Sequence, residues 1–463
     1  MKIYNTLTKG KQAFVPLREG EVSIYACGPT VYNYFHIGNA RPFILFDTLR
    51  RYLRYRGYRV TLVQNFTDID DKMINRANQE GISVKELADR FIQEYYVDAH
   101  GLNIMDADVA PKATEHIEEI IAIIRRLVER DLAYESEGDV YFAARDFEGY
   151  GKLSGQNIED LTSGARVDIA EIKRDPLDFA LWKAQKPGEP AWESPWGMGR
   201  PGWHIECSAM SMKYLGESID IHGGGQDLVF PHHENEIAQS EGFSGKPFSN
   251  YWMHNGYINV DNQKMSKSLN NFFTVREIGE EFELTAVRLF MLGAHYRSPI
   301  NFSRALIEQA ENGLGRIRQA YGLLKRRAAG SGVSGTEEAI LLDNLDGHRQ
   351  RFIEAMDDDL NTADALGRLF ELVRQANTAF ADGGSPEGAQ KTLDLMDEIV
   401  GVLGLLMEKP DSGIPQGILD MADQREAARK ERDWAEADRL RALVTEAGYS
   451  IEDTKEGPLV KKL

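Results

Sequence analysis

Apolar residues in the N-terminal part of the chain follow two different spacings. Residues 22–27 form a short apolar run typical of a buried strand, and residues 59–66 predict a second strand. Between them, residues 39–56 repeat apolar positions three and four apart, which predicts an amphipathic helix. A strand, a helix and a strand in this order predict a βαβ unit, so we expect an α/β fold with a parallel sheet.

The pattern changes further along the chain. Residues 117–128 predict one more amphipathic helix, which we place in an insertion between two halves of the sheet, at about 75–200. Residues 218–222 and 251–254 are strand-like again, and both are followed by polar segments. From residue 303 onwards we expect helices throughout, because the apolar residues keep a helical spacing.

The length of the chain predicts more than one domain, because 463 residues are too many for a single core. We expect an α/β domain over 1–302, a helical region over 303–408 and a small terminal module over 418–463. Segment 409–415 contains two prolines and a glycine and predicts a linker.

Composition favours a globular protein of the cytoplasm. Apolar residues make up 42% of the chain, but the longest apolar stretch, 399–407, is too short to span a bilayer. The first residues lack the pattern of a signal peptide, so we expect neither export nor association with a membrane. In a reducing compartment, two cysteines far apart in sequence are metal ligands or reactive thiols rather than a disulfide. Two inert buried thiols are the alternative.

The net charge of −19 disfavours indiscriminate binding of polyanions. It leaves room for a local nucleic-acid site, because arginines and lysines concentrate at 50–56 and 316–327. Solvated helix faces are the commoner reason for such clusters.

The two cysteines lie in segments rich in potential metal ligands. Cys27 ends the first predicted strand, and Cys207 follows the run Trp203-His204-Ile205-Glu206. Segment 231–236 adds two histidines and two glutamates. Two thiols, an imidazole and a carboxylate satisfy a tetrahedral zinc ion. Glu236 lies four residues after His232 and three after His233, so both histidines remain candidates from the residues alone.

Two other segments suit a polyphosphate. His36-Ile37-Gly38-Asn39 leads into the predicted helix, whose N-terminus offers backbone N–H groups and the positive end of the helix dipole. Lys264-Met265-Ser266-Lys267-Ser268 places two lysines three residues apart with hydroxyls between them. A K-x-x-K segment alone is usually solvated surface, but the two motifs together are far more specific. Glycines 223–225 would let the backbone approach a nucleotide closely.

The pair HIGN and KMSKS resembles the signature of the class I aminoacyl-tRNA synthetases. Within that class, five segments resemble the cysteinyl-tRNA synthetases, and the similarity runs essentially from end to end. These segments are 27–32, 66–72, 202–208, 222–227 and 231–236. The similarity implies a class I Rossmann-like catalytic domain over 1–302, a DALR-type tRNA-binding bundle over 303–408 and an anticodon-binding module over 418–463.

The resemblance also implies a role for each matching residue. The catalytic residues would be His36, Asn39, Lys264 and Lys267. The ATP-binding residues would be His36, Gly38, Asn39, Gly224 and Lys267. The residues that bind the amino acid would be Thr67, Trp203, His222 and Asp227. The zinc ligands would be Cys27, Cys207, His232 and Glu236. Asn39 replaces the second histidine of the usual signature, but its amide can still donate to a phosphate.

The implied reaction is the ATP-dependent activation of L-cysteine to cysteinyl-adenylate and its transfer to the 3′-terminal ribose of tRNA(Cys). One Zn²⁺ per chain would recognise the thiolate of the substrate, Mg²⁺ would accompany ATP, and we expect a monomer. A zinc ion that only ties the fold together is the alternative for the metal.

Two other functions are considered. A ligase that joins cysteine to an amino sugar would have no use for residues 418–463. A non-catalytic nucleotide- or tRNA-binding protein would not need HIGN, KMSKS and the zinc ligands together.

Overall fold

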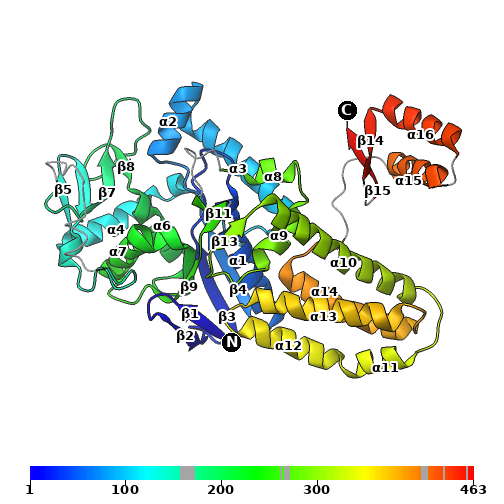
Figure 1. Cartoon of the computed structure of the whole chain (residues 1–463). Coiled ribbons are helices and arrows are strands. Elements are labelled where there is room, and N and C mark those ends of the chain that lie inside the picture. Colours follow the sequence, from blue (N-terminus) through cyan, green and yellow to red (C-terminus); the bar gives the residue numbers. More distant parts are fainter. Residues whose placement is uncertain are drawn as a thin grey trace. The chain divides into compact units, whose positions relative to one another are not determined.

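The computed structural model divides the chain into two units, Met1–Leu405 and Leu406–Leu463. Each unit, drawn as a ribbon in Figure 1, has a hydrophobic core of its own. The residues that the structure describes are 1–156, 173–260, 263–264, 272–407, 416–430, 433–454 and 457–462.

The centre of unit 1 is a four-stranded parallel sheet of order β10-β9-β3-β4. Its strands are β3 (Glu21–Ala26), β4 (Arg59–Gln64), β9 (Ile219–Gly225) and β10 (Ser249–Asn255). Helix α1 (Ile37–Tyr55) connects β3 to β4, so the predicted βαβ unit is confirmed. The strands are largely buried, as expected for a parallel sheet covered on both faces.

Shorter elements surround this sheet. Strands β1 (Lys2–Asn5) and β2 (Gly10–Ala13) form an antiparallel pair at the start of the chain. Helices α2 (Asp71–Glu80) and α3 (Val84–Gly101) follow β4. The helices near the ends of β9 and β10 are α6 (Trp203–Leu215), η3 (Gln226–Leu228), η4 (Val229–His233) and α7 (Glu234–Ser244).

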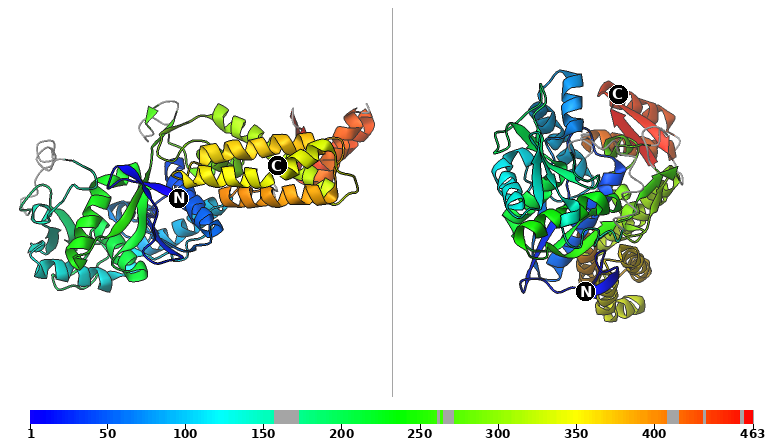
Figure 2. Two further views of the ribbon diagram at one scale, coloured as in Figure 1. Left: turned by 90° about the horizontal axis from the view of Figure 1, so that it is seen from below. Right: turned by 90° about the vertical axis from the view of Figure 1, so that its left-hand side faces the viewer.

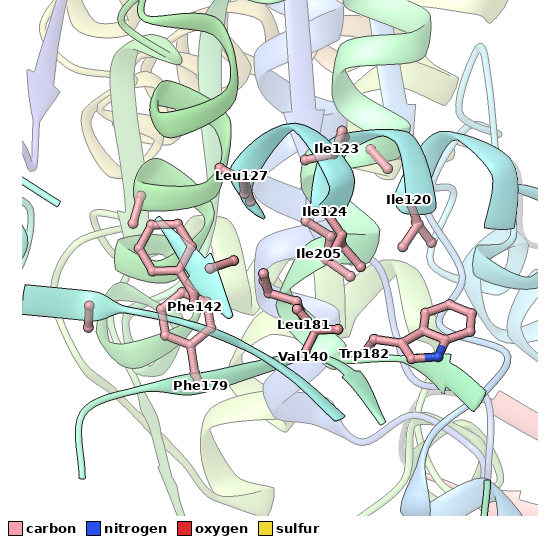
Figure 3. Packing of buried hydrophobic residues seen from close by; sticks show 14 of the residues in the cluster. Ile120, Ile123, Ile124, Leu127, Val140, Phe142, Phe179, Leu181, Trp182 and Ile205 are labelled. Carbon is pink, nitrogen blue, oxygen red and sulfur yellow. The ribbon is translucent and has the colours of Figure 1, made fainter. Parts of the chain in front are cut away.

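An antiparallel sheet of order β5-β6-β7-β8 interrupts the parallel one in sequence. Its strands are β5 (Ala133–Ser136), β6 (Asp139–Phe142), β7 (Phe179–Ala184) and β8 (Gly199–Pro201). The helix predicted at 117–128 is α4 (Ile117–Glu129), and its buried isoleucines and Leu127 pack over this sheet (Figure 3). Short 3-10 helices flank these elements at η1 (Ala113–Glu115) and η2 (Ala144–Asp146).

A small sheet of order β12-β11-β13 follows β10. It consists of β11 (Ile258–Val260), β12 (Gln263–Lys264) and β13 (Ile300–Phe302). Strand β11 pairs with β13 in parallel and with β12 in antiparallel. Helices α8 (Val275–Gly279) and α9 (Leu284–Leu292) lie between β12 and β13 in sequence.

Unit 1 ends in a bundle of helices. Its members are α10 (Arg304–Ala328), α11 (Thr336–Asp343), α12 (Leu345–Asp357), α13 (Thr362–Phe380) and α14 (Pro386–Leu403). Figures 1 and 2 both show α13 and α14 lying along α10. None of the helices among the described residues is both long and apolar enough to cross a membrane.

Unit 2 consists of two helices and a hairpin. The helices are α15 (Gln416–Lys430) and α16 (Trp434–Glu446), and the strands are β14 (Tyr449–Thr454) and β15 (Gly457–Lys462). The expectation of helices throughout the region after 303 is therefore wrong for the last residues. Ile451 and Val460 are paired across the hairpin and buried with Ile418, so packing against α15 favours strands over the weak local helical pattern.

Candidate functional site

The candidate site lies at the carboxyl ends of the parallel strands. Cys27 follows β3, Thr67 follows β4 by three residues, and Gly224 and His254 lie near the ends of β9 and β10. Ligand sites of open α/β sheets form at this edge. Helices α6 and α7 bring Cys207 and Glu236 to the same place.

Cys27, Cys207, His232 and Glu236 form a buried group that could hold a metal ion. The Sγ atoms of the two cysteines are 4.0 Å apart, and Cys207 Sγ is 3.7 Å from His232 Nε2. Glu236 Oε1 lies 3.6 Å from Cys27 Sγ and 3.0 Å from His232 Nε2. All four donor atoms lie within 4.8 Å of one another.

A second buried group shares two of these residues and consists of Cys27, His222, His233 and Glu236. His233 Nε2 is 3.2 Å from Cys27 Sγ, and His222 Nε2 is 2.7 Å from Glu236 Oε2. The structure thus brings both histidines of the 231–236 segment to the cluster.

The charges of the cluster depend strongly on one another. A hydrogen bond from Cys27 lowers the pKa of Cys207 to about 6, while burial raises the pKa of Cys27 well above its ordinary value. Burial would raise the pKa of Glu236, but His222 and His232 outweigh it and hold that pKa well below the usual range. Burial opposes charge on His232 too, yet Glu236 and Cys207 raise its pKa to about 10.

These shifts describe a cluster that keeps a thiolate and a carboxylate ionised in a buried place. A proton on His232 balances part of their charge. A cation with an affinity for sulfur, nitrogen and oxygen could replace that proton, because metal ligands bind in their deprotonated forms. The chemistry of the donors therefore fits a divalent metal ion.

Trp203 and Thr67 lie next to this cluster. The indole ring of Trp203 stacks on the ring of His232, with 4.2 Å between the centroids, and Trp203 is 43% exposed. The buried hydroxyl of Thr67 donates to Glu206 Oε2 at 2.9 Å. Asp227 lies in η3 and is exposed.

The HIGN segment forms the start of α1. His36 is the N-cap of the helix, and its Nδ1 accepts a hydrogen bond from the N–H of Asn39 at 3.3 Å. Gly38 and Asn39 lie in the first turn and are half-buried. Phosphate groups can bind at such a helix end, since N–H groups and the dipole point towards it.

Gly224, Lys264 and Lys267 are the other residues predicted to bind ATP or to act in catalysis. Gly224 is buried in β9, and a Cβ atom there would lie 2.8 Å from the side chain of Leu228. The backbone of Lys264 lies in β12, where it pairs with Asn259. Lys267 lies outside the described residues.

Sequence reasoning missed several buried polar residues around the cluster. His254 Nε2 is 2.7 Å from His233 Nδ1, and His254 Nδ1 is 2.8 Å from the hydroxyl of Thr6. Asn65 Oδ1 accepts a hydrogen bond from the N–H of Gly28 and lies 3.8 Å from Cys207 Sγ. Asn65 and His254 both lie at the ends of buried strands, and that position is the signal that could have indicated them.

Comparison with known proteins covers nearly the whole chain. Residues 13–312 match the family of tRNA synthetases class I (C) catalytic domains. Residues 351–407 match the DALR domain, and residues 411–457 match the cysteinyl-tRNA ligase anticodon binding domain. The chain belongs to the cysteine–tRNA ligase family.

Two relatives in this family match it from end to end. The chain is 57% identical over 465 aligned positions to the cysteine–tRNA ligase of Caldicellulosiruptor saccharolyticus and 55% identical to that of Clostridioides difficile. Each alignment covers 100% of both proteins. The family that the motifs predicted is confirmed.

Solved structures show the same fold at low sequence identity. Mycobacterium tuberculosis methionyl-tRNA synthetase, in complex with methionyl-adenylate, is 15% identical with a TM-score of 0.60, covering 87% of this chain and 93% of that one. Thermus thermophilus arginyl-tRNA synthetase is 12% identical with a TM-score of 0.55, covering 88% and 85%. The predicted Rossmann-like fold, with its insertion and its helical C-terminal part, is confirmed.

Proposed function

We propose that this protein is a cysteine–tRNA ligase that activates L-cysteine with ATP and transfers it to tRNA(Cys). The carboxylate of cysteine would attack the α-phosphorus of ATP, breaking its bond to pyrophosphate. The 3′-terminal ribose hydroxyl of the tRNA would then attack the carbonyl carbon and release AMP. The buried two-thiol cluster beside the HIGN helix, in a chain matched from end to end by cysteine–tRNA ligases, supports this function.

We assign Zn²⁺ to Cys27, Cys207, His232 and Glu236. Tetrahedral coordination requires about 3.8 Å between two sulfurs, about 3.6 Å between a sulfur and a nitrogen or oxygen, and about 3.4 Å between nitrogen and oxygen. The measured distances of 4.0, 3.7, 3.6 and 3.0 Å come close to these values. The bound ion would supply a site that prefers the thiolate of cysteine to the hydroxyl of serine.

The overlapping group with His222 and His233 is the less suitable one. It contains only one thiol, and thiolates are the ligands that zinc favours most. Second contacts do not separate the two histidines, because His233 Nδ1 is 2.7 Å from His254 Nε2 and His232 Nδ1 is 2.8 Å from His204 Nδ1.

The chain's own residues would divide the remaining work. We assign cysteine binding to Thr67, Trp203, His222 and Asp227, of which Trp203 is half exposed against His232 and could cover the substrate. We assign ATP binding to His36, Gly38, Asn39, Gly224 and Lys267. His36, Asn39, Lys264 and Lys267 would stabilise the charge that develops on the phosphates, together with Mg²⁺.

The same proposal extends to the organisation of the protein. We assign catalysis to 1–302 with its insertion at about 75–200, support of the tRNA to 303–408 and anticodon binding to 418–463. We further propose a monomer of the cytoplasm.

One experiment tests this function directly. The purified protein should catalyse cysteine-dependent exchange between ATP and pyrophosphate, and labelled cysteine should then transfer to tRNA(Cys). A Lys264→Met variant is the control for exchange by a contaminating enzyme. Absence of exchange would refute the proposal, and transfer to an amino sugar in place of tRNA would support the alternative ligase.

A further inference from the structure

Arg41 is a buried arginine in the second turn of α1, close to the HIGN segment. Its guanidinium donates to four backbone carbonyl oxygens. Two belong to Gly256 and Tyr257, at 2.7 and 3.1 Å. The other two belong to His295 and Ser298, at 3.2 and 2.5 Å.

None of the ion pairs among the described residues includes Arg41, so carbonyl dipoles take the place of a carboxylate. Burial lowers the pKa of Arg41 to about 10. An arginine held away from water in this way needs several good acceptors, and the planar guanidinium can reach several at once. Burial of this charge costs free energy unless such acceptors compensate it.

The four carbonyl groups lie on two segments that cross next to α1. Gly256 and Tyr257 connect β10 to β11, and residues 295–298 lead from α9 into β13. The two segments touch closely, because a Cβ atom on Gly256 would lie 2.7 Å from the carbonyl oxygen of Arg297. Arg41 therefore ties the beginnings of two strands, β11 and β13, to α1.

Strand β11 in turn pairs with β12, the strand that contains the backbone of Lys264. Strand β11 pairs with β13 on one side and with β12 on the other, where Asn259 is the partner of Lys264. Residues 273–275, which follow β12 in sequence, are also hydrogen-bonded to the start of α1. The N–H of Ile37 donates to Phe273 and the N–H of Val275 donates to Phe35, both at 3.1 Å. Segments before and after 265–271 are thus bonded to residues 35–41.

We propose that Arg41 is a positioning residue, which fixes β11 and β12, and with them the backbone of Lys264, relative to His36 and Asn39. This inference rests on the proposed function. Both groups must contact one ATP molecule in the transition state, and a displacement of about 1 Å between them can cost about 100-fold in rate.

Replacement of Arg41 by Met tests this role, with Arg50→Met as the matched control. Arg50 is also buried in α1 and also donates to carbonyl oxygens, those of Met105 and Asp106, and it differs from Arg41 in pairing with the carboxylates of Asp47 and Asp108 at 3.4 and 3.8 Å. We expect Arg41→Met to lower kcat of cysteine-dependent exchange about 100-fold. KM for cysteine and zinc content should stay at wild-type values, because the cluster is built on β3, α6, η4 and α7.

Hydrogen exchange gives a readout that does not depend on activity. The amides of β11 should exchange faster in Arg41→Met than in Arg50→Met, whereas those of α6 should be unchanged in both. Arg41→Lys keeps the charge but can reach fewer carbonyl groups, so we expect a kcat between those of wild type and Arg41→Met. If Arg41→Met does not fold, Arg41→Lys alone tests the proposal. A lower kcat of Arg41→Lys with an unchanged KM for cysteine then supports the positioning role of Arg41.

The opposite results are equally clear. Equal effects of Arg41→Met and Arg50→Met on kcat, or a wild-type kcat in Arg41→Lys when Arg41→Met cannot fold, would overturn the positioning role. Loss of zinc from Arg41→Met together with the fall in kcat would show that Arg41 has a general structural role and not a positioning role. A wild-type protein without cysteine-dependent exchange would refute the proposed function itself.

Discussion

His232 and His233 are neighbours in sequence whose rings serve different partners. The Nε2 atom of His232 faces Cys207 and Glu236, and its other nitrogen is 2.8 Å from His204 Nδ1. The Nε2 atom of His233 faces Cys27, and its other nitrogen faces His254. These adjacent residues at the end of η4 thus bring their Nε2 atoms to different members of one cluster.

This arrangement predicts different effects of the same change at the two positions. His232→Gln removes a proposed ligand and should weaken zinc binding by more than about 100-fold. His233→Gln removes an outer contact to Cys27 and should weaken zinc binding by about 10-fold. Competition with a chromophoric chelator measures both affinities. The reverse order would identify the group with His222 and His233 as the ligands.

Cys207→Ser tests whether the metal recognises the substrate. The variant should lose zinc, and its preference for cysteine over serine in kcat/KM should fall by at least about 100-fold, because a pocket without the metal distinguishes the two only weakly. Exchange assays with each amino acid, beside metal analysis, give the ratio. An intact preference in a zinc-free protein that still folds would mean that the metal is structural.

The sequence alone could indicate part of this site. The two thiols, His232 and Glu236 lie in polar runs that stand out against apolar strands. Asn65 and Glu206 could not be assigned, because their roles depend on how β4 and α6 meet, and that contact joins residues far apart in the chain. The choice between His232 and His233 likewise cannot be made from their spacing to Glu236, and the structure brings both into candidate metal groups.

At the scale of whole elements, a buried ion cluster joins α1, α9 and the end of α14. Asp47 accepts hydrogen bonds from Arg288 at 2.6 Å and from Arg51 at 2.8 Å. Arg288 also donates to the carbonyl oxygen of Leu403 at 2.8 Å. Asp47 and Arg288 are both almost completely buried, so each depends on the other to compensate its charge.

Asp47→Asn should therefore destabilise unit 1 strongly. Removal of one partner leaves the charge of Arg288 buried without compensation, which costs about 3–5 kcal/mol. Asp346→Asn is the control, because the carboxylate of Asp346 is 95% exposed in its pair with Arg349 and should contribute less than about 1 kcal/mol. Urea unfolding followed by circular dichroism compares the two. Equal losses in both variants would contradict a structural role of the buried cluster.

The same cluster predicts a dependence of stability on pH. Burial would raise the pKa of Asp47, but Arg288 and Arg51 outweigh it and hold that pKa below its ordinary value. The stabilisation is therefore complete above the unfolded pKa of about 3.9 and is lost as the pH falls through the lower, folded value. The difference in unfolding free energy between wild type and Asp47→Asn should be constant from about pH 5 to 7 and shrink only below about pH 4. A difference that changed near neutral pH would assign the effect to another group.

Helices could be predicted from the sequence where the helical spacing of apolar residues continued over several turns. The helix expected at 39–56 is α1 at Ile37–Tyr55, and the amphipathic helix expected at 117–128 is α4. The hairpin of β14 and β15 was not predicted, because its buried positions are few and its stability comes from contact with α15. The domain bounds drawn from sequence stay a prediction.

At the scale of the whole molecule, the candidate active site and the predicted anticodon-binding module lie in different units. The cluster, α1 and the parallel sheet all belong to unit 1. The match to the anticodon binding domain lies at 411–457, within unit 2, which has its own core around Val444 and Ile451. Activation of cysteine and selection of tRNA should therefore be separable.

A chain ending at Met407 should keep cysteine-dependent exchange within about threefold of wild type but lose efficiency with tRNA. Contacts to unpaired bases contribute about 1–3 kcal/mol each, so the loss of two of them predicts a fall of at least about 30-fold in kcat/KM for tRNA.

In the full chain, Trp434→Ala should reproduce a smaller part of that fall, since Trp434 is 60% exposed and its replacement leaves the core of unit 2 intact. Aminoacylation at several tRNA concentrations, beside the exchange assay, separates the two activities. Loss of exchange in the shortened chain would mean that unit 1 needs unit 2 to reach its active structure, and an unchanged kcat/KM for tRNA would exclude unit 2 from recognition.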